Sequence, residues 1–248
     1  MMPPARGTTP QGITNEQAAS RWVREMFGQI AGHYDLLNHL LSFNLDTRWR
    51  ARTVERVADV LERPGARALD LCCGTGEILL SLEARNKTAE ILGSDFCHPM
   101  LVEAGRKIRT RGLRSPLFEA DALALPLAAG SLDLITVAFG FRNLANYQDG
   151  LIELARVLKP GGVLAVLEFS QPRNKTFAAA YGFFSTRVLP FVGGSISGSR
   201  EAYSYLPESI RKFPGAEDLA AQMRSAGFAQ VEFERMTFGS VALHIARK

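Results

Sequence analysis

The sequence predicts a single α/β domain built on a mostly parallel sheet, and three observations support this fold class. From residue 66 onward, short apolar runs bounded by Gly, Asp or Pro alternate with segments of helical length, a pattern typical of parallel strands joined by crossovers. Before residue 66, the apolar side chains follow helical spacing instead. A chain of 248 residues with 46% hydrophobic residues can bury one large core, so residues 14–248 are expected to form one domain.

The N-terminal part of the chain predicts a short tail followed by a helical cap. Residues 1–13 are rich in Pro, Gly and Thr and lack the apolar run of a signal peptide, so we expect a disordered tail. Residues 14–63 place Trp22, Met26, Ile30 and several valines at helical spacing, which predicts the cap.

The segments that follow the cap predict a sheet of seven strands. The expected strands of residues 64–170 are 67–71, 90–94, 117–120, 132–138 and 163–169, and the expected helices are 76–84, 98–110 and 149–158. The last helix is expected to stop at Lys159-Pro160-Gly161-Gly162, because Pro and Gly end helices. Residues 215–248 predict a helix at 216–226 and an antiparallel hairpin of 231–238 and 241–246 at the sheet edge.

Composition and charge exclude several classes of partner. The net charge of +4 comes from Lys and Arg scattered among Asp and Glu, without the basic run that follows a phosphate backbone, so we expect no nucleic acid partner. Cys72, Cys73 and Cys97 lack metal-ligand spacing and predict reduced core residues, with no metal site. No run approaches the about 18 apolar residues of a membrane span, which predicts a cytoplasmic protein, either soluble or peripheral at the inner face of the membrane.

A glycine loop closes the first predicted strand and opens a helix. Gly74, Thr75 and Gly76 in the run LDLCCGTG allow a tight turn whose backbone can approach a ligand, although a GxG turn alone is as typical of an ordinary strand-to-helix connection. Leu79 stands where a dinucleotide fingerprint needs its third glycine, and the acid Asp70 precedes the turn. A carboxylate beside this loop, acting directly or through water, suits the ammonium and sulfonium charges of S-adenosylmethionine better than a pyrophosphate.

Two further acids follow the next two predicted strands. Asp95 lies 19 residues beyond Gly76, where a carboxylate can accept hydrogen bonds from both ribose hydroxyls. Asp121-Ala122 follows the third strand, where the acid can accept from an adenine amino group while apolar neighbours pack the ring. Three acids at three successive strand ends, with the glycine loop, resemble the cofactor site of class I methyltransferases, which have a Rossmann-like fold and bind S-adenosylmethionine.

Longer motifs resemble one family over residues 27–248. They are Tyr34-Asp35-Leu36-Leu37-Asn38 with Ser42 and Trp49, Ala138-Phe139-Gly140-Phe141-Arg142-Asn143, Arg156-Val157-Leu158-Lys159-Pro160-Gly161-Gly162 through Glu168-Phe169-Ser170, and Glu201-Ala202-Tyr203-Ser204-Tyr205-Leu206 to Ser209-Ile210-Arg211. The chain is similar to the C-methyltransferases of ubiquinone and menaquinone biosynthesis. Leu37 and Asp46 replace the family's usual Met and His, and Ala138 replaces a frequent Ser, which affects a side-chain contact to the cofactor there.

The resemblance implies methylation of a ring carbon of a prenylated hydroquinone, most simply of demethylmenaquinol to menaquinol. The benzoquinol of the ubiquinone pathway remains an alternative substrate. Two other readings stay open, a methyltransferase acting on oxygen or nitrogen of another small molecule and a cofactor-binding partner without catalysis. A homodimer is a further expectation.

Four side chains are the predicted catalytic set. Arg142, after the fourth strand, is expected to stabilise the phenolate of the substrate while Asn143 fixes its orientation. Tyr34 and Asp35, in the cap, are expected to relay or accept its proton, with packing and helix capping as the alternative roles. Residues 171–214 contain the apolar stretch 177–194, which predicts a lid for an isoprenoid tail at the membrane surface or, alternatively, a buried core helix.

Overall fold

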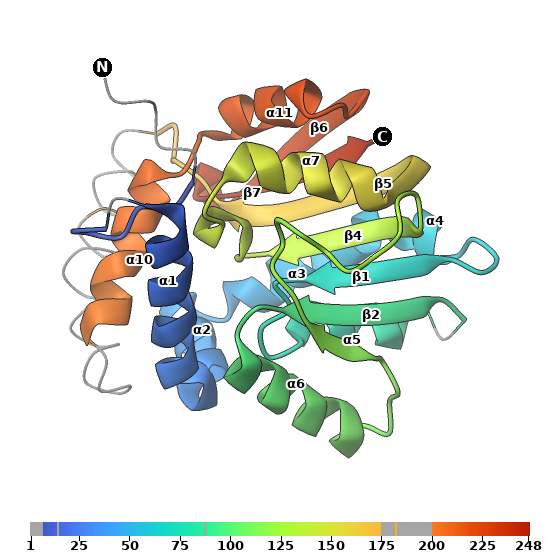
Figure 1. The fold of residues 1–248 in the computed structure, drawn as a ribbon, viewed down its shortest axis with the longest axis horizontal. Helices are drawn as coiled ribbons and strands as arrows, with labels where there is room; N and C mark the ends of the chain where they lie inside the picture. The colour runs from blue at the N-terminus through green and yellow to red at the C-terminus, as the bar shows by residue number, and fades with distance from the viewer. Residues whose placement is uncertain (1–6, 14, 87, 175–181, 183–199) are drawn as a thin grey trace.

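The computed structural model describes residues 7–13, 15–86, 88–174, 182 and 200–248. Its centre is a seven-stranded sheet with the strand order β3-β2-β1-β4-β5-β7-β6, flanked by helices (Figure 1). The strands are β1 (Arg67–Leu71), β2 (Glu90–Asp95), β3 (Leu117–Glu119), β4 (Leu132–Ala138), β5 (Leu158–Phe169), β6 (Gln230–Met236) and β7 (Val241–Arg247). β1 to β5 pair in parallel, whereas β7 pairs antiparallel with both β5 and β6.

Two layers of helices cover the two faces of the sheet. α7 (Tyr147–Val157) and α11 (Ala216–Ser225) pack on one face, against Ile135 and Val137 of β4. α3 (Leu45–Arg56), α4 (Ala58–Leu61) and α5 (Glu77–Arg85) pack on the other face, where Leu134 of the same strand belongs to their core. Because successive strand side chains alternate between faces, a strand covered on both sides is apolar almost throughout. α6 (His98–Thr110) lies beside β2 and β3.

Only the first part of the predicted helical cap, residues 14–63, lies over the carboxyl ends of the parallel strands, because α3 and α4 pack on a face of the sheet instead. The part that covers the strand ends, called the cap from here on, consists of α1 (Glu16–Ile30), η1 (Ala31–His33) and α2 (Tyr34–Leu41), and α10 (Arg200–Lys212) runs beside it on the left of Figure 1. Val23, Met26 and Ile30 of α1 form a buried cluster with Tyr205 of α10. The cap therefore closes the edge of the sheet where ligands bind in folds of this kind.

The predicted fold class is confirmed, with shifts at a few element ends. β1, β4 and α6 have the predicted bounds. β5 begins at Leu158 rather than at residue 163, because Leu158 pairs with Leu132 before an irregularity in the β4 register. The helix expected at 149–158 spans Tyr147–Val157, since the Asn146 side chain caps it by accepting a hydrogen bond from the Asp149 amide. The hairpin of β6 and β7 lies at the sheet edge as expected.

The N-terminal segment differs from the disordered tail that its composition predicts. Thr8 is buried, and its amide donates a hydrogen bond to the carbonyl of Leu144 at 2.8 Å. Its hydroxyl lies 2.6 Å from the Tyr205 hydroxyl, and Lys212 donates to the Thr9 carbonyl at 2.7 Å. These contacts hold Thr8 and Thr9 against the domain. Composition alone cannot predict them, because each partner is over 130 residues away in sequence.

We predict that Gly7→Ala detaches this segment. A Cβ atom at residue 7 would lie 2.2 Å from the backbone carbon of Ala145, which cannot move aside without disturbing η2 (Phe141–Asn143). A protease should then cleave within residues 7–13 at least about fivefold faster than in the wild type. This factor corresponds to a loss of roughly 1 kcal/mol in the free energy that holds the segment against the domain. The exposed Gln11→Ala is the matched control and should digest like the wild type. Equal protection of Gly7→Ala would show that the packing does not depend on this close approach.

Candidate functional site

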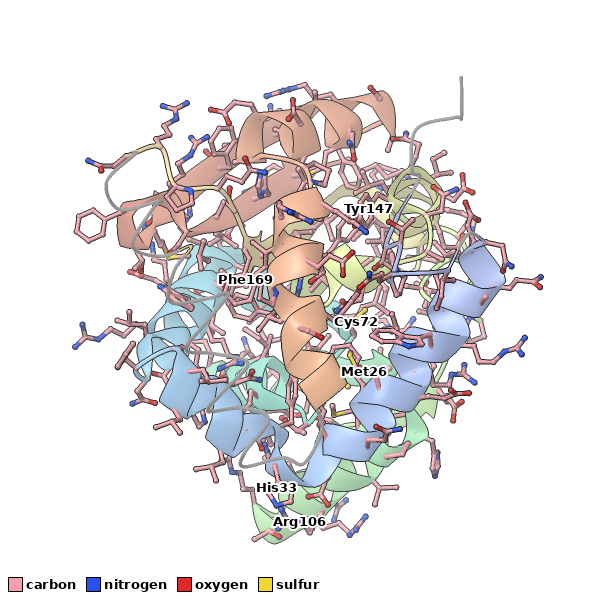
Figure 2. All side chains as sticks on the ribbon, turned by 90° about the vertical axis from the view of Figure 1, so that its left-hand side faces the viewer. Met26, His33, Cys72, Arg106, Tyr147 and Phe169 are labelled. Atoms are coloured by element: carbon pink, nitrogen blue, oxygen red, sulfur yellow. The ribbon has the colours of Figure 1, made fainter. Side chains whose placement is uncertain are left out.

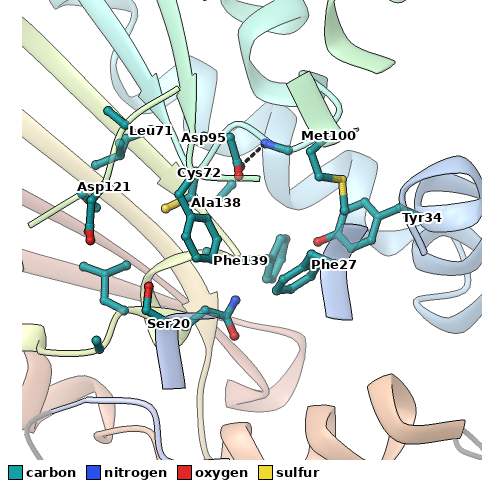
Figure 3. Close-up of a pocket in the computed structure, with 18 residues that line it drawn as sticks. Ser20, Phe27, Tyr34, Leu71, Cys72, Asp95, Met100, Asp121, Ala138 and Phe139 are labelled. Carbon is teal, nitrogen blue, oxygen red and sulfur yellow. Dashed lines mark hydrogen bonds between the residues drawn. The ribbon is translucent and has the colours of Figure 1, made fainter. Parts of the chain in front are cut away.

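A pocket of about 680 Å³, partly open to solvent, lies between the cap and the carboxyl ends of the strands (Figure 3). A cavity of this size holds a ligand as large as a nucleoside with a side arm. Its walls come from α1 and α2 on one side and from the loops after β1, β2, β3 and β4 on the other. The lining residues are Ser20, Phe27, Tyr34, Leu71, Cys72, Gly74, Asp95, Phe96, Met100, Ala120, Asp121, Ala122, Ala138, Phe139, Gly140, Asn143, Leu144 and Ala145.

The glycine loop turns sharply between β1 and α5. Gly74 and Gly76 have φ angles of 54° and 84°, in the left-handed region that glycine adopts without strain. Gly74 lines the pocket, whereas Gly76 packs against α6, where an added Cβ would lie 3.3 Å from Ala104 Cβ. The two predicted glycines therefore have different roles, one in the pocket wall and one in the close packing of helices.

Asp95 holds the glycine loop in shape and also faces the pocket. Its Oδ2 accepts a hydrogen bond from the Gly74 amide at 2.8 Å, drawn in Figure 3, and its Oδ1 accepts from the Cys97 amide at 2.9 Å. Burial raises the pKa of this carboxyl to about 6. Each carboxylate oxygen keeps a further lone pair, so Asp95 can still accept from a ligand hydroxyl.

Asp70 lies beneath the loop and is not among the residues that line the pocket, whereas the sequence predicts that this acid acts on the cofactor directly or through water. Its carboxylate accepts hydrogen bonds from the Leu79 amide at 3.0 Å and from the Thr136 hydroxyl at 2.8 Å. Burial raises its pKa to about 7. Strand alternation explains the difference, since the side chain before the turn points to the face that α5 covers. Asp70 fixes the start of α5 and, through it, the loop.

Thr75 and Asp35 join the loop to the cap and do not line the pocket. The Thr75 hydroxyl donates to Asp35 Oδ1, and Lys107 Nζ lies 2.6 Å from Asp35 Oδ2 and 2.5 Å from Glu77 Oε1. Both oxygens of Asp35 are thus engaged outside the pocket, which agrees with a structural role and leaves Asp35 away from a bound substrate.

The loop after β3 and the end of β4 complete the first pocket. Asp121 and Ala122 line it, and Asp121 Oδ1 accepts from the Leu123 amide at 3.0 Å while the side chain stays exposed. Ala138 also lines the pocket, and its methyl group offers no polar contact there. All three of these predicted residues therefore line the first pocket.

A second cavity of about 640 Å³, here called the inner chamber, adjoins the first pocket. Phe27, Tyr34 and Phe139 line both cavities, so the two spaces meet at these three rings. Figure 2 views the molecule from the side where α1 and α10 cover them. The other residues of the chamber are Met26, Ile30, Asn38, Ser42, Asp46, Trp49, Arg50, Arg142, Phe169, Tyr205 and Leu206.

Arg142 stands in the wall of the inner chamber as a buried ion pair. Its Nη1 lies 3.0 Å from Glu168 Oε1 and also donates to the Phe139 carbonyl, and its guanidinium lies 5.2 Å from the centre of the Phe169 ring. Its Nε has no hydrogen-bond partner among the described residues. A buried donor without a partner is costly, and an oxygen of a bound molecule would satisfy it.

Asn143 and Tyr205 connect the two cavities by hydrogen bonds. Tyr205, in the chamber, donates to Asn143 Oδ1, in the first pocket, at 2.9 Å. This leaves the amide NH₂ of Asn143 for a ligand. Tyr205 belongs to a motif that the sequence analysis names, but it is not among the predicted catalytic side chains. Sequence alone does not indicate its role, because its partner Asn143 is 62 residues away in sequence.

Tyr34 stands at the junction of the two cavities. Burial raises the pKa of its phenol above the usual value, even though Arg142 acts in the opposite direction. At neutral pH the residue is therefore a hydroxyl that can donate a hydrogen bond rather than a phenolate that can accept a proton.

The described residues contain neither a membrane-spanning helix nor a cluster of metal ligands. No described helix has the length and hydrophobicity to cross a bilayer. In the same part of the chain, His, Cys, Asp and Glu side chains nowhere gather in a group of three or more that would suit a metal ion.

Comparison with known proteins gives a consistent result. The model of the ubiE/COQ5 methyltransferase family matches residues 14–248. A protein named demethylmenaquinone methyltransferase from Thermus thermophilus is 52% identical over 89% of this chain and 98% of its own length. A second, named ubiquinone/menaquinone biosynthesis C-methyltransferase UbiE, from Syntrophotalea carbinolica, is 44% identical over 90% of this chain and 92% of its own.

Solved structures share the fold at low sequence identity. A SAM dependent methyltransferase from Aquifex aeolicus matches with a TM-score of 0.56 and 20% identity over 78% of this chain and 88% of its own. The [4+2]-cyclase SpnF matches with a TM-score of 0.61 and 20% identity over 80% of each chain. The second match shows that this fold alone does not fix the reaction.

We predict that Asp70→Asn changes how the free energy of unfolding depends on pH. The carboxyl has a pKa of about 7 in the folded protein and near 3.8 when unfolded. As the pH rises from about 4 to about 7, the unfolded chain loses this proton before the folded protein does. The free energy of unfolding of the wild type therefore decreases, on the order of 4 kcal/mol in total. Asn carries no such proton and should remove that loss. Urea unfolding of both proteins at the two pH values measures it, and parallel curves would contradict the assignment.

Proposed function

Because this chain belongs to the ubiE/COQ5 methyltransferase family, we propose that it transfers a methyl group from S-adenosylmethionine to a ring carbon of a prenylated hydroquinone, most simply demethylmenaquinol. The observation that carries this proposal is the pair of adjoining cavities. One has the glycine loop and acids of a nucleoside site, and the other has aromatic walls with buried polar groups. Phe27, Tyr34 and Phe139 line both cavities, where the bound cofactor and the bound hydroquinone would meet.

The residues of the first pocket fit S-adenosylmethionine. Asp95 offers lone pairs to the ribose hydroxyls, and Asp121 offers a carboxylate to the adenine amino group next to the apolar Ala122. Gly74 lets the backbone approach the ligand, because its pocket side carries no Cβ. Asp70 and Thr75 act on this site from outside, by holding α5 and the cap in place.

The inner chamber would hold the hydroquinone ring between aromatic side chains. S-adenosylmethionine, when bound in the first pocket, would supply a methyl group on a sulfonium for transfer to a nucleophilic carbon. A ring carbon becomes nucleophilic when its neighbouring hydroxyl, with a pKa of about 10, gives up its proton. The buried guanidinium of Arg142 lowers the pKa of such a hydroxyl, and its unpartnered Nε can donate to the oxygen. Asn143, through its free NH₂, orients the ring.

We propose that the regions of the chain divide the work in the same way. Residues 14–63 would be the helical cap region, of which α1, η1 and α2 cover the site, residues 64–170 the cofactor-binding core, residues 171–214 the substrate lid region and residues 215–248 the closing helix and hairpin. Within the lid region, Tyr205 and Leu206 of α10 line the inner chamber. Most of the apolar stretch 177–194 lies outside the described residues.

We also propose a cytoplasmic location with peripheral contact with the membrane, since a prenylated acceptor dissolves in the bilayer. Leu36 and Leu40 on α2 are 59% and 50% exposed, on the cap that covers the site. Exposed apolar side chains on one helix suit an interface with lipid. The homodimer stays a prediction from the sequence.

The proposed function is tested by incubating the protein with methyl-labelled S-adenosylmethionine and reduced demethylmenaquinone. Mass and fragmentation of the product should place the label on a ring carbon. A parallel reaction with the benzoquinol intermediate decides between the two quinol substrates. Label on an oxygen atom would show that the enzyme is an O-methyltransferase. Binding of the cofactor without methyl transfer to any quinol would favour a non-catalytic role.

We predict that Asp95→Asn weakens S-adenosylmethionine binding by about 10- to 100-fold, because hydrogen bonds to a carboxylate contribute roughly 1.5–3 kcal/mol and an amide cannot accept from both hydroxyls. Titration calorimetry measures this. Glu119, which pairs with Asp95 in the β2–β3 register but does not line the pocket, supplies the control Glu119→Gln. Equal affinity for all three proteins would remove Asp95 from the binding site.

We predict that Arg142 acts in turnover and not in cofactor binding. Arg142→Ala alone would leave the Glu168 carboxylate buried without a counter-ion, at a cost of about 3–5 kcal/mol. The double variant Arg142→Met/Glu168→Gln removes both charges and should fold. Its kcat should fall by roughly 100-fold or more with cofactor affinity unchanged. Glu168→Gln, which keeps the guanidinium, is the matched control, and wild-type turnover of the double variant would exclude Arg142 from the mechanism.

A further inference from the structure

A second buried polar cluster, formed by His39, Ser42, Asp46 and Arg50, lies at the wall of the inner chamber, apart from the Arg142–Glu168 pair. Asp46 has a side chain only 3% exposed, and its Oδ1 accepts a hydrogen bond from the Ser42 hydroxyl at 2.8 Å. Its Oδ2 is ion-paired with Arg50 and lies 2.8 Å from Nδ1 of His39. The cluster joins the end of α2 to the first turn of α3.

The cluster reaches from the chamber to the surface. Ser42, Asp46 and Arg50 line the chamber, whereas His39 does not. The side chain of His39 is 34% exposed, and its partner Asp46 is almost fully buried. Asp46 therefore stands between the chamber and a titratable group in contact with solvent.

The proposed reaction needs such a path. When a methyl group replaces a ring hydrogen and the sulfonium becomes a neutral thioether, one proton is left over for each turnover. The hydroxyl O–H bond breaks first, and its electron pair makes the ring nucleophilic. After the new C–C bond forms, the ring carbon loses its hydrogen as a proton and the oxygen regains one, so a single proton must leave the chamber.

Few of the described groups can accept that proton. Asp46 is the only carboxylate among the described residues that line the chamber. The phenols of Tyr34 and Tyr205 have raised pKa values, chiefly through burial, and serve as donors. Glu168 is 1% exposed and is occupied by Arg142 and by the Phe169 amide. Asp35 lines neither cavity.

We propose that Asp46 and His39 form the proton exit of the methyl transfer, a conclusion that rests on the proposed function. The proton of the bound hydroxyl passes by way of Asp46 to Nδ1 of His39 and from the imidazole to water. Asp46 contacts the substrate in this scheme and is a catalytic residue, whereas His39 acts through it and is a positioning and relay residue.

The charges around Asp46 suit transfer rather than storage of a proton. Although burial alone would raise it, the pKa of Asp46 lies below its usual range because of His39, Arg50 and Ser42. A carboxylate of this kind does not keep the proton and passes it on to the imidazole. The other charged or titratable groups that face it across the chamber are Tyr34, Arg142 and Tyr205.

The test compares His39→Gln, His39→Ala and Asp46→Asn with the wild type in the quinol methylation assay. His98→Gln is the matched control, since His98 also pairs with a carboxylate, Glu119 at 3.3 Å, but lines neither cavity. We expect the kcat of the His39 variants to fall about tenfold or more and that of Asp46→Asn roughly 100-fold, with KM little changed. The acidic limb of the pH profile of kcat should shift in the His39 variants.

Added imidazole separates a proton-carrying role from a structural one. It should restore several-fold activity to His39→Ala and none to Asp46→Asn or to the wild type, because only the first variant lacks an imidazole in a solvent-accessible position. Calorimetric binding of S-adenosylmethionine and thermal unfolding, measured on each variant, should match the wild type for the His39 variants.

The outcomes are distinct. A wild-type protein without turnover on any quinol refutes the proposed function. Wild-type turnover with unchanged kcat and pH profiles in the His39 variants refutes the proton exit alone. Lost activity in His39→Ala that imidazole does not restore, with an unshifted pH profile in His39→Gln, makes His39 structural and also overturns the inference.

Discussion

The cavities exist because the chain leaves β1 and β4 toward opposite faces of the sheet. After β1 it turns into α5, on the face of α3 and α4, and after β4 it passes through η2 to α7, on the other face. The two neighbouring strands therefore open a crevice at their carboxyl ends, as in other open α/β sheets. The side chains that line the first pocket come from the carboxyl ends of β1 to β4 and the loops after them, from Met100 of α6 and from the cap above them. The hydrogen bonds of Asp70 and Asp95 keep the exit of β1 in the required shape.

The inner chamber is held by charges that are costly to bury. Arg142 pairs with Glu168 and Arg50 pairs with Asp46, and the two guanidinium groups lie over Phe169 and Phe139, whose ring centres are 4.9 Å apart. Buried ion pairs contribute little net stability, because the loss of hydration offsets their attraction. They do fix the positions of four polar groups around aromatic walls. Such an arrangement is suited to a flat acceptor with hydroxyl groups on its ring.

The sequence predicted those parts of the fold and site that depend on local pattern. The bounds of β1, β4 and α6 follow from apolar runs between turn residues. Asp95 and Asp121, which the sequence predicts at strand ends, both line the first pocket because these strand ends meet at one edge. The orientation of Asp70 depends on which face a strand residue points to, and the position of Asp35 depends on its contact with Lys107, 72 residues later. His39 and Asp46 are only seven residues apart, but their pairing appears only when α2 and α3 fold against each other.

The link from Thr8 through Tyr205 to Asn143 has a consequence for how the protein is made. Synthesis proceeds from the N-terminus, so Thr8 leaves the ribosome early, whereas Tyr205 follows 197 residues later. β7, which lies between β5 and β6 in the sheet, comes after both. The nascent chain therefore carries an unfinished sheet edge and an open site until nearly all of it has been translated. A ligand therefore has no complete site to bind until translation is nearly finished.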